Sequence, residues 1–289
     1  MTASSIKRFD IIKVSGTDGH STADALAIEE PLEIRLEYGA ENERTVQNVS
    51  VTMRTPGNDV ELAIGFLFTE GIIKDQLDID EAGHVFIACA ENKENVILVK
   101  LKPGAIPNLQ NAERNFYTTS SCGVCGKGSI DAIRTVSPFI NDKGSSAVVH
   151  ADVLYSLPII LAYHQSAFAE TGGIHAAGLF NADGSLLLLR EDVGRHNALD
   201  KLIGAALNQN RLPLDKSILL LSGRASFELV QKAAMAGITI IASVGAPSSL
   251  AVELAAEFNI TLTGFLKNNR FNIYNAAHRI ILPVHEASY

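Results

Sequence analysis

The segment SILLLSGRASFELVQKAAMAGITIIASVGAPSSLAVELAAEFNITLTGF, residues 217–265, alternates three short apolar runs with two longer amphipathic ones. Short runs that are apolar throughout are typical of parallel strands buried in a sheet, and the longer runs have helical spacing. In the second predicted helix, Leu250, Leu254 and Phe258 lie at i, i+4 and i+8 and are expected to form its apolar stripe. The segment therefore predicts a βαβαβ unit whose right-handed crossovers pack helices on the sheet.

Upstream of this unit, GGIHAAGLF, NADG and SLLLLR predict a β-hairpin around an Asp-Gly turn. The first half of the chain has a different pattern, because LEIRLEY and VSVTMRT alternate apolar and polar residues as half-buried strands do. The segment TPGNDVELAIGFLFTEGII predicts a helix with Asp59 as its N-cap and Gly71 as its stop signal.

These patterns predict an α/β protein, α+β overall, in three parts. Residues 1–24 are polar and are expected to be a flexible N-terminus. Residues 25–115 are expected to form a small α+β domain that ends in the Pro- and Asn-rich link KPGAIPNLQNAERN. Residues 116–289 are expected to form the larger α/β domain, preceded by a cysteine-containing loop.

Composition excludes several classes of function. The chain has 289 residues and a formal net charge of −8, which argues against a broad nucleic-acid-binding surface. Its start, MTASSIKRFDIIKV, lacks the apolar core of a signal peptide, and no apolar run approaches the roughly 20 residues of a membrane helix. We therefore expect a cytoplasmic protein in a reducing compartment, with neither nucleic acid nor membrane as its partner.

Basic and small polar residues follow the predicted strands at the edge where ligands bind in open α/β sheets. The loops EDVGRHNALDK, SGRAS, SVGAPSS and LKNNRFNIY should open on this edge. They contribute Arg195, His196, Ser222, Arg224, Lys267 and Arg270. No Walker A loop or full Rossmann fingerprint is present. The cluster indicates a small polyanionic ligand such as a nucleotide or pyrophosphate.

Two of the three cysteines, Cys122 and Cys125, lie between glycines in TTSSCGVCGKGSID, residues 118–131, whereas Cys89 lies in an apolar run. In a reducing compartment a CxxC pair indicates catalysis or metal binding. Three interpretations remain open: half of a zinc site, a thioredoxin-like dithiol, and a thiolate that carries sulfur as a persulfide.

His175 suggests a fourth possibility, a zinc deaminase, which uses H-x-E together with P-C-x-x-C. Here alanines follow His175, and Ser121 precedes Cys122 where the motif has proline. The CxxC pair also precedes the histidine instead of following it. Deamination is therefore disfavoured, and His175 is equally well explained as a core residue.

Taken together, RTPGNDVELAIGFLFTEGII, CGVCG, TGGIHAAGLF, REDVGRHNALDKLIG, SGRASFELVQKAAMAGI, APSSLAVELA and GFLKNNRFNIY resemble the FdhD family of formate dehydrogenase accessory sulfurtransferases. The resemblance runs from about Glu30 to Tyr274, and its most specific parts are EDVGRHNALDK and the CxxC loop. It implies a larger domain similar to the cytidine deaminase fold, three layers around a mixed sheet, in which His175 would be a relic position.

The resemblance also implies an activity. Such proteins take persulfide sulfur from a cysteine desulfurase and deliver it to the metal of a bis(molybdopterin guanine dinucleotide) cofactor, which formate dehydrogenase requires. The persulfide-bearing cysteine falls on Cys122, with Cys125 as its partner. The cofactor-binding stretch falls on Phe265, Leu266, Lys267, Asn268, Asn269 and Arg270. Family members often carry glycine or proline where this chain has Asn268 and Asn269.

From these implications we expect Arg195, Arg224, Lys267 and Arg270 to contact phosphates, with Ser222 nearby. Asp192 is expected either to orient Arg195 or to bind a guanine edge, and His196 to cap a helix or to support a ligand contact. The partners would be a cysteine desulfurase, the apo formate dehydrogenase, the guanine dinucleotide cofactor as bound substrate and a second copy in a homodimer. No dedicated metal ion is expected.

Two other classes compete with the enzyme. One is a non-catalytic chaperone that binds the molybdenum cofactor and docks the apo formate dehydrogenase, and the other is a structural zinc protein. The sequence leaves open which formate dehydrogenase is served, whether the metal is molybdenum or tungsten, and whether Cys122 or Cys125 carries the sulfur.

Overall fold

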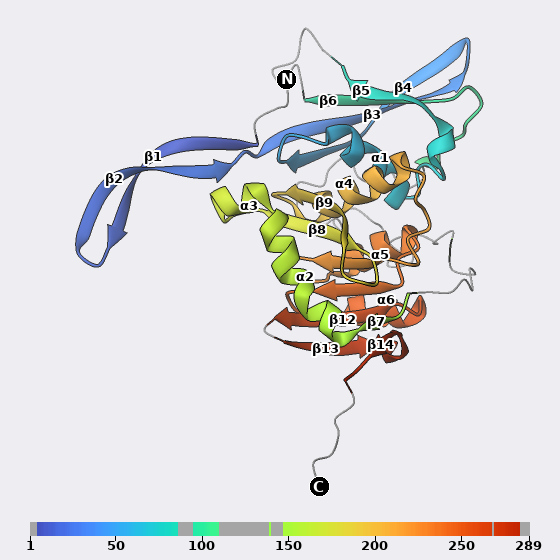
Figure 1. The fold of residues 1–289 in the computed structure, drawn as a ribbon. Coiled ribbons are helices and arrows are strands. Elements are labelled where there is room, and N and C mark those ends of the chain that lie inside the picture. Colours follow the sequence, from blue (N-terminus) through green and yellow to red (C-terminus); the bar gives the residue numbers. More distant parts are fainter. Residues whose placement is uncertain (1–4, 86–94, 110–138, 140–146, 268, 284–289) are drawn as a thin grey trace.

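The structure, a computed structural model, describes residues 5–85, 95–109, 139, 147–267 and 269–283 (Figure 1). Its larger unit is built on a mixed six-stranded sheet with strand order β13-β12-β11-β10-β8-β9. The strands are β8 (His175–Phe180), β9 (Leu186–Asp192), β10 (Ile218–Leu221), β11 (Ile240–Ser243), β12 (Thr261–Lys267) and β13 (Arg270–Asn275). Strands β10, β11 and β12 are parallel, whereas β8 and β13 are antiparallel to their neighbours.

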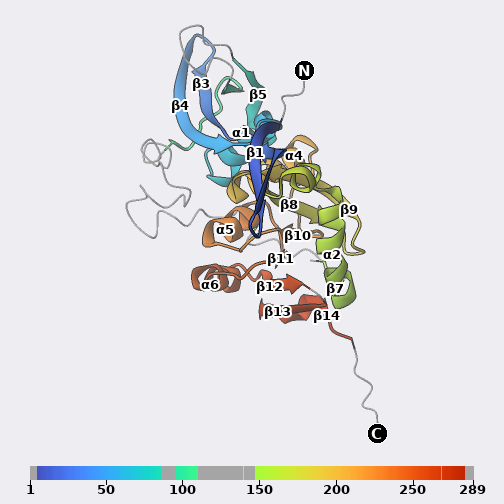
Figure 2. The ribbon, with the colours of Figure 1, turned by 90° about the vertical axis from the view of Figure 1, so that its left-hand side faces the viewer.

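Helices cover both faces of this sheet, and Figure 2 shows α5 and α6 on one side and α2 on the other. The helices are α2 (Ala151–His164), α3 (Ser166–Thr171), α4 (Arg195–Asn208), α5 (Phe227–Met235) and α6 (Ser249–Glu257). Alternating strand residues enter two separate clusters: Leu219 packs with α4, α5 and α6, and Leu220 packs with α2. The predicted three-layer α/β architecture with a mixed sheet is confirmed.

One detail of the predicted helix pattern is wrong. Leu250 is 38% exposed, and the buried residues of α6 are Ala251, Leu254 and Ala255. The predicted stripe is therefore wrong only at Leu250, since Leu254 is buried and Phe258 packs against the core as predicted. The predicted hairpin β8–β9 is present, with Gly184 in its turn at φ +87°.

The smaller unit consists of a four-stranded sheet, order β4-β3-β6-β5, and one helix. Its elements are β3 (Glu30–Ala40), β4 (Glu43–Arg54), α1 (Asp59–Thr69), η1 (Gln76–Asp78), β5 (Ile79–His84) and β6 (Val96–Leu101). Further short elements are β7 (Val149–His150), which pairs with β14 (Ile280–Ile281), and η4 (Ala277–Arg279).

The ends of α1 confirm one sequence signal and correct another. Gly71 follows the helix with φ +70°, as predicted for a stop. The N-cap, however, is Asn58 in a left-handed conformation and not Asp59. Asp59 lies in the first turn, where its buried carboxylate accepts hydrogen bonds from Arg54 at 2.9 and 3.1 Å. Ion pairing with a buried arginine therefore determines the position of this carboxylate.

The two units share one continuous hydrophobic core. It joins Ile34 and Ile97 of the small sheet to Leu202 and Leu219 of the larger unit. The predicted boundary at residue 115 lies outside the described residues and stays a prediction.

Helices α1 and α4 form the contact between the two units. At the crossing, a Cβ on Gly65 would lie 1.9 Å from the Asp200 carbonyl oxygen, and a Cβ on Gly204 would lie 1.9 Å from the Glu61 carbonyl oxygen. Reciprocal glycines thus let the two backbones touch.

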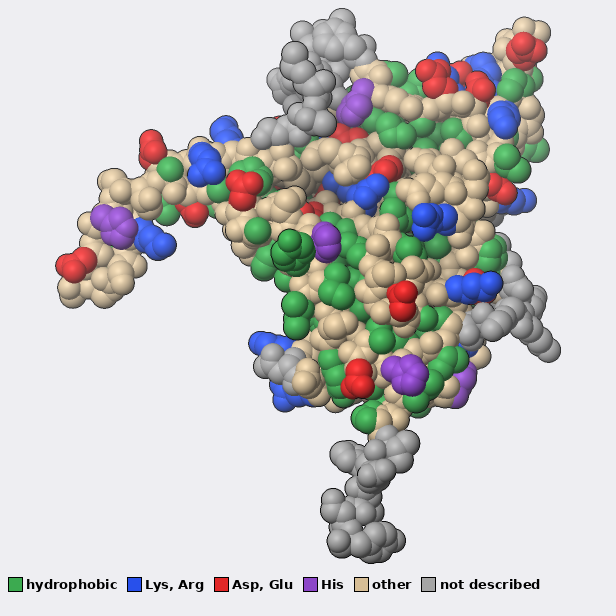
Figure 3. Space-filling model, viewed as in Figure 1, with side chains coloured by type: hydrophobic (Ala, Val, Ile, Leu, Met, Phe, Trp, Pro, Cys, Tyr) green, Lys and Arg blue, Asp and Glu red, His purple; other side chains and the backbone are tan. Residues whose placement is uncertain are grey.

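Most of residues 1–24, which were expected to be a flexible N-terminus, form regular strands. Strands β1 (Ile6–Ser15) and β2 (Asp18–Ala27) form an antiparallel hairpin that projects from the body (Figure 1). Most of its side chains are exposed, and the face seen in Figure 3 carries charges of both signs. Pairing along the hairpin satisfies backbone groups while leaving polar side chains in water, so polar composition did not exclude strands here. Arg8 lies 3.6 Å from Glu170 of α3.

Within the described part of the chain, every helix is too short or too polar to cross a bilayer.

The close α1–α4 contact predicts that one added methyl group destabilises the fold. Gly204→Ala should lower the free energy of unfolding by about 3 kcal/mol, because the new methyl group must displace the backbone of α1. Gly83→Ala is the matched control, since a Cβ there meets nothing within 4 Å. Urea denaturation of both variants measures the difference, and equal stability of the two would show that the helix crossing tolerates expansion.

Candidate functional site

Strands β9, β10, β11 and β12 all end at one edge of the large sheet, and β8 begins there. The predicted gathering of the strand-end loops at one edge is therefore confirmed. Ser222 joins two of these strands: its Oγ accepts a hydrogen bond from the Ala176 N–H at 2.8 Å, and its own N–H donates to the Ala176 carbonyl at 3.0 Å. This places His175, the first residue of β8, beside the end of β10.

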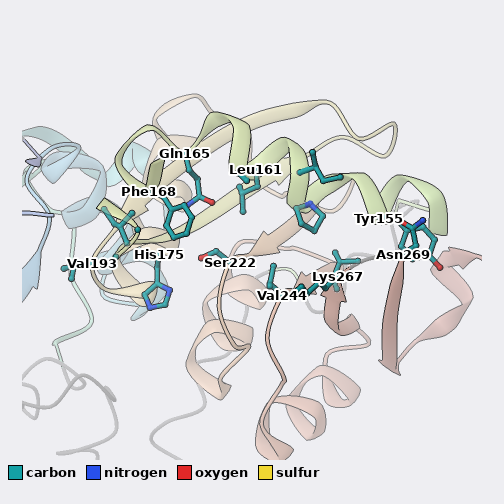
Figure 4. A pocket seen from close by; sticks show the side chains of 17 residues that line it. Tyr155, Leu161, Gln165, Phe168, His175, Val193, Ser222, Val244, Lys267 and Asn269 are labelled. Atoms are coloured by element: carbon teal, nitrogen blue, oxygen red, sulfur yellow. The ribbon is translucent and has the colours of Figure 1, made fainter. Parts of the chain in front are cut away.

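A cavity of about 890 Å³ lies between this edge and helices α2 and α3 (Figure 4). One wall comes from α2 and α3, and the other comes from the strand ends. Its lining residues are Tyr155, Pro158, Ile159, Leu161, Ala162, Gln165, Phe168, Gly172, Gly173, Ile174, His175, Val193, Ser222, Val244, Leu266, Lys267 and Asn269. A largely apolar space with a few polar groups at its wall is typical of a small-molecule site.

The predicted site residues divide into three groups. Ser222, Leu266, Lys267 and Asn269 line the cavity. Arg195, Arg224, Phe265 and Arg270 belong to the same sheet edge but are not among the lining residues. Asn268, Cys122 and Cys125 lie outside the described residues, so their roles stay predictions.

The end of β12 has the geometry of a bulge. Phe265 adopts φ +55°, which is unusual for an aromatic residue, and its N–H donates to the Gly245 carbonyl at 3.1 Å. The register shifts between Gly264 and Lys267. As a result Phe265 is 45% exposed, while Leu266 is buried against the cavity. The bulge thus brings Lys267 to the rim of the cavity.

Basic residues meet at this rim and on the loop beside it. Lys267 and Arg270 are paired across the β12–β13 hairpin, whose turn contains Asn269 at φ +57°. Arg224 is exposed on the loop after β10, and a Cβ on Gly245 would lie 2.8 Å from the Arg224 Cγ. Glycine at 245 therefore allows two strand-end loops to pack closely. The three cations are available to an anionic ligand that extends out of the cavity.

A second positive group lies at the opposite end, around His175. Burial lowers the pKa of the His175 imidazole, and the neighbouring Arg195 and His196 lower it further, against a smaller opposing effect of Asp192. Arg195 opens α4, whose N-cap Gly194 supplies no side-chain cap. The Arg195 Nε is buried and has no hydrogen-bond partner among the described residues. Positive potential, from the arginine and the helix N-terminus, thus adjoins the cavity.

His196 connects two helices and does not line the cavity. Its Nε2 lies 3.2 Å from the Ser226 Oγ and 3.4 Å from a Glu228 carboxylate oxygen. Burial would raise the pKa of Glu228, but its hydrogen bond and ion pair with His196 lower the pKa below its ordinary value. His196 therefore links the first turns of α4 and α5, and its predicted support of a ligand contact stays a prediction.

The two roles predicted for Asp192 are wrong. Its carboxylate is fully buried and lies 2.7 Å from the buried Lys201 ammonium. It also accepts hydrogen bonds from the Gly194 N–H at 2.8 Å and the Thr55 N–H at 3.2 Å. Burial raises the pKa of this carboxyl, and Lys201 opposes the rise. An acidic group enclosed in this way has no free edge for guanine, and its partner is Lys201 rather than Arg195.

The α2–α3 wall of the cavity is not predictable from a sequence motif. Tyr155, Gln165 and Phe168 all line it, but LYSLPIILAYHQSAF carries no motif that separates a cavity wall from an ordinary buried helix. Among the residues that the structure describes, no three His, Cys, Asp or Glu side chains converge on a common metal-binding point.

The chain matches a known protein family over most of its length. The model of the FdhD/NarQ family matches residues 27–281. The chain belongs to this family. The family predicted from the sequence segments is therefore confirmed.

Relatives in this family are similar over nearly their whole length. The chain is 52% identical over 260 residues to the sulfur carrier protein FdhD of Mycolicibacterium paratuberculosis, covering 89% of this chain and 92% of the relative. It is 48% identical over 279 residues to the sulfur carrier protein FdhD of Streptomyces coelicolor, covering 96% of each. A crystal structure assigned as a formate dehydrogenase accessory protein from Desulfotalea psychrophila superposes with a TM-score of 0.70 at 25% identity, covering 96% of this chain and 99% of that one.

The buried pair beneath the site can be tested directly. Asp192→Asn should lower the free energy of unfolding by about 3 kcal/mol, because Lys201 is left buried without a counter-charge. Glu81→Gln, which breaks the exposed pair with Lys100, should leave stability unchanged within error and serves as the control. An equally small loss in Asp192→Asn, measured by urea denaturation, would contradict the structural role assigned to Asp192.

The charge around His175 predicts a pH effect with a defined sign. Its folded-state pKa lies below the ordinary value of 6.5. Between these two values the unfolded chain binds more protons at this position, so His175 contributes a stability that is present above pH 6.5 and is lost as the pH falls through the folded-state pKa.

Removal of the neighbouring cation should raise that pKa. In Arg195→Met the His175 pKa is expected to move up towards 6.5, whereas Arg211→Met, at an exposed position, should leave it unchanged. Titration of the imidazole resonances by NMR provides the measurement. Identical midpoints in both variants would show that Arg195 exerts no field on His175.

Proposed function

We propose that this protein is a sulfur carrier for formate dehydrogenase, acting in the cytoplasm. It takes persulfide sulfur from a cysteine desulfurase onto Cys122 and delivers it to the metal of a bis(molybdopterin guanine dinucleotide) cofactor, which is its substrate. The observation that carries the proposal is the family match across residues 27–281, which includes the CGVCG segment. The names of its relatives, sulfur carrier protein FdhD, support it.

The first step is a thiolate–persulfide exchange. The Cys122 thiolate attacks the outer sulfur of the desulfurase persulfide, the S–S bond of that persulfide breaks, and the desulfurase cysteine leaves as a thiolate. The outer sulfur keeps its proton and becomes the terminal atom of a Cys122 persulfide, so no external oxidant or reductant is needed. Cys125 either attacks the outer sulfur and becomes the persulfide in turn, with Cys122 leaving as a thiolate, or attacks the inner sulfur, which releases hydrosulfide and leaves a Cys122–Cys125 disulfide that a thiol reductant must reopen.

The cavity and its cationic rim support the second half of the proposal. A guanine dinucleotide combines flat rings with several phosphates, and the cavity combines apolar walls with Lys267 at its rim. Arg224 and Arg270 on the adjoining loops are candidates for further phosphate contacts. Arg195, whose Nε has no partner among the described residues, is a fourth. Charge-assisted hydrogen bonds from such groups bind phosphate strongly.

Mass spectrometry tests the carrier role. After incubation with a cysteine desulfurase and cysteine, Cys122 should gain about 32 Da, the mass of one sulfur atom carried as a persulfide. Cys122→Ala should lose this adduct and fail to activate formate dehydrogenase, while Cys89→Ala is the control that keeps both. A Cys125→Ala variant shows which cysteine of the pair receives the sulfur first.

Assays of formate dehydrogenase activation and of GDP binding separate the carrier from a non-catalytic chaperone. If the Cys122→Ala and Cys125→Ala double variant supports full activation of formate dehydrogenase, the protein acts by binding the cofactor alone, and the carrier proposal is wrong. If the double variant binds GDP as the unchanged protein does but activates nothing, the thiols are required for a step after binding.

A further inference from the structure

Gln165 occupies a fixed position in the wall of the cavity. It lies between α2 and α3, where its N–H donates to the Leu161 carbonyl at 3.1 Å and its carbonyl accepts from the Ala169 N–H at 3.0 Å. These two backbone hydrogen bonds, one to each helix, hold the Cα of Gln165 in a fixed position. The residue is 5% exposed and lines the cavity.

The carboxamide of Gln165 is incompletely satisfied. Its Nε2 is buried and has no hydrogen-bond partner among the described residues. A buried amide donor without a partner destabilises a folded chain, and methionine would fill a similar volume without that penalty. Packing alone thus favours an apolar residue at this position, which indicates that the amide has a partner when the cavity is occupied.

The surroundings of Gln165 define the shape of that partner. Leu161, Phe168 and Ile174 form the apolar wall beside it, and Val244 and Leu266 lie on the strand-end side. Figure 4 shows Gln165, Phe168 and Leu161 together on one side of the cavity, with Ser222 and Val244 across from them and Lys267 further along, towards Tyr155 and Asn269. A space between apolar walls with one buried amide suits a flat heteroaromatic ring, and phosphates carried on the ribose of a nucleotide would extend towards Lys267.

We propose that Gln165 binds the polar edge of a bicyclic ring on which a carbonyl and a ring N–H lie side by side, the edge that guanine and pterin share. This inference rests on the proposed function, which supplies the class of ligand. The Gln165 Nε2 donates to the ring carbonyl and its Oε1 accepts from the ring N–H. Because the terminal torsion of a glutamine is broad, the carboxamide turns to present both atoms without moving the helices.

Binding measurements with three probes test the assignment. The unchanged protein, Gln165→Met and Gln209→Met are titrated calorimetrically with GDP, pterin-6-carboxylate and inorganic pyrophosphate. Gln209 follows α4 as its C-cap, is exposed and does not line the cavity, so it is the matched control. In Gln165→Met we expect GDP or the pterin to bind roughly thirtyfold more weakly, the ratio for two hydrogen bonds, with pyrophosphate unaffected. The probe whose affinity falls in Gln165→Met identifies the ring, guanine or pterin, that binds beside Gln165.

Thermal unfolding separates recognition from folding. Gln165→Met should melt at the same temperature as the unchanged protein or higher, since it removes an unpaired buried donor. Unchanged GDP and pterin affinities in this variant would overturn the inference and leave the proposed function intact. A lower melting temperature with equal loss for all three probes would also overturn it, by showing a structural role. If the unchanged protein binds neither ring, both proposals fail, whereas a missing Cys122 persulfide affects only the carrier step.

Discussion

The close crossing of α1 and α4 is the contact on which the arrangement of the two units depends. Gly65 and Gly204 bring each helix backbone against a carbonyl oxygen of the other, so neither position has room for a Cβ. Lys232 of α5 extends this contact: its ammonium lies 3.0 Å from Asp200 and 2.9 Å from the Thr69 hydroxyl. Burial disfavours its charge, but attraction from Asp200 and Glu70 raises the Lys232 pKa above its ordinary value. Packing and charge therefore fix the same crossing.

That crossing also determines the geometry of the candidate site. The chain leaves β4 through Thr55, whose N–H and carbonyl are bound by Asp192 and Lys201 at the junction of β9 and α4. The first turn of α4 is thereby held at the sheet edge, with Arg195 next to His175. The small unit acts on the cavity indirectly, since Thr55 anchors the β9–α4 loop that precedes Arg195, while none of the residues from its described strands or helix lines the cavity.

The fold was predictable where one residue pattern had one physical explanation. Apolar runs in residues 217–265 predicted buried parallel strands, and strand order then placed Ser222 and Lys267 on one edge. The site was predictable only on that side. Asp192 was misassigned because its partner Lys201 lies further along the helix than the obvious Arg195, and the α2–α3 wall was missed because Gln165 differs from its apolar neighbours only after folding buries it. The N-terminal hairpin was not predicted because most of its side chains are exposed, so no alternation of apolar and polar residues marks its strands.

Two buried N–H donors near the cavity lack a partner within the described residues, whereas the buried cations that maintain the fold are paired. Three buried cations are enclosed by acceptors: Arg54 by Asp59, Lys201 by Asp192 and Lys232 by Asp200. In the described part of the chain, the buried side-chain nitrogens without a partner are Gln165 Nε2 and Arg195 Nε. One lines the cavity and the other adjoins it through His175. Both are N–H donors, so the complementary ligand presents acceptor oxygens at two points, as a carbonyl-bearing ring joined to phosphates does.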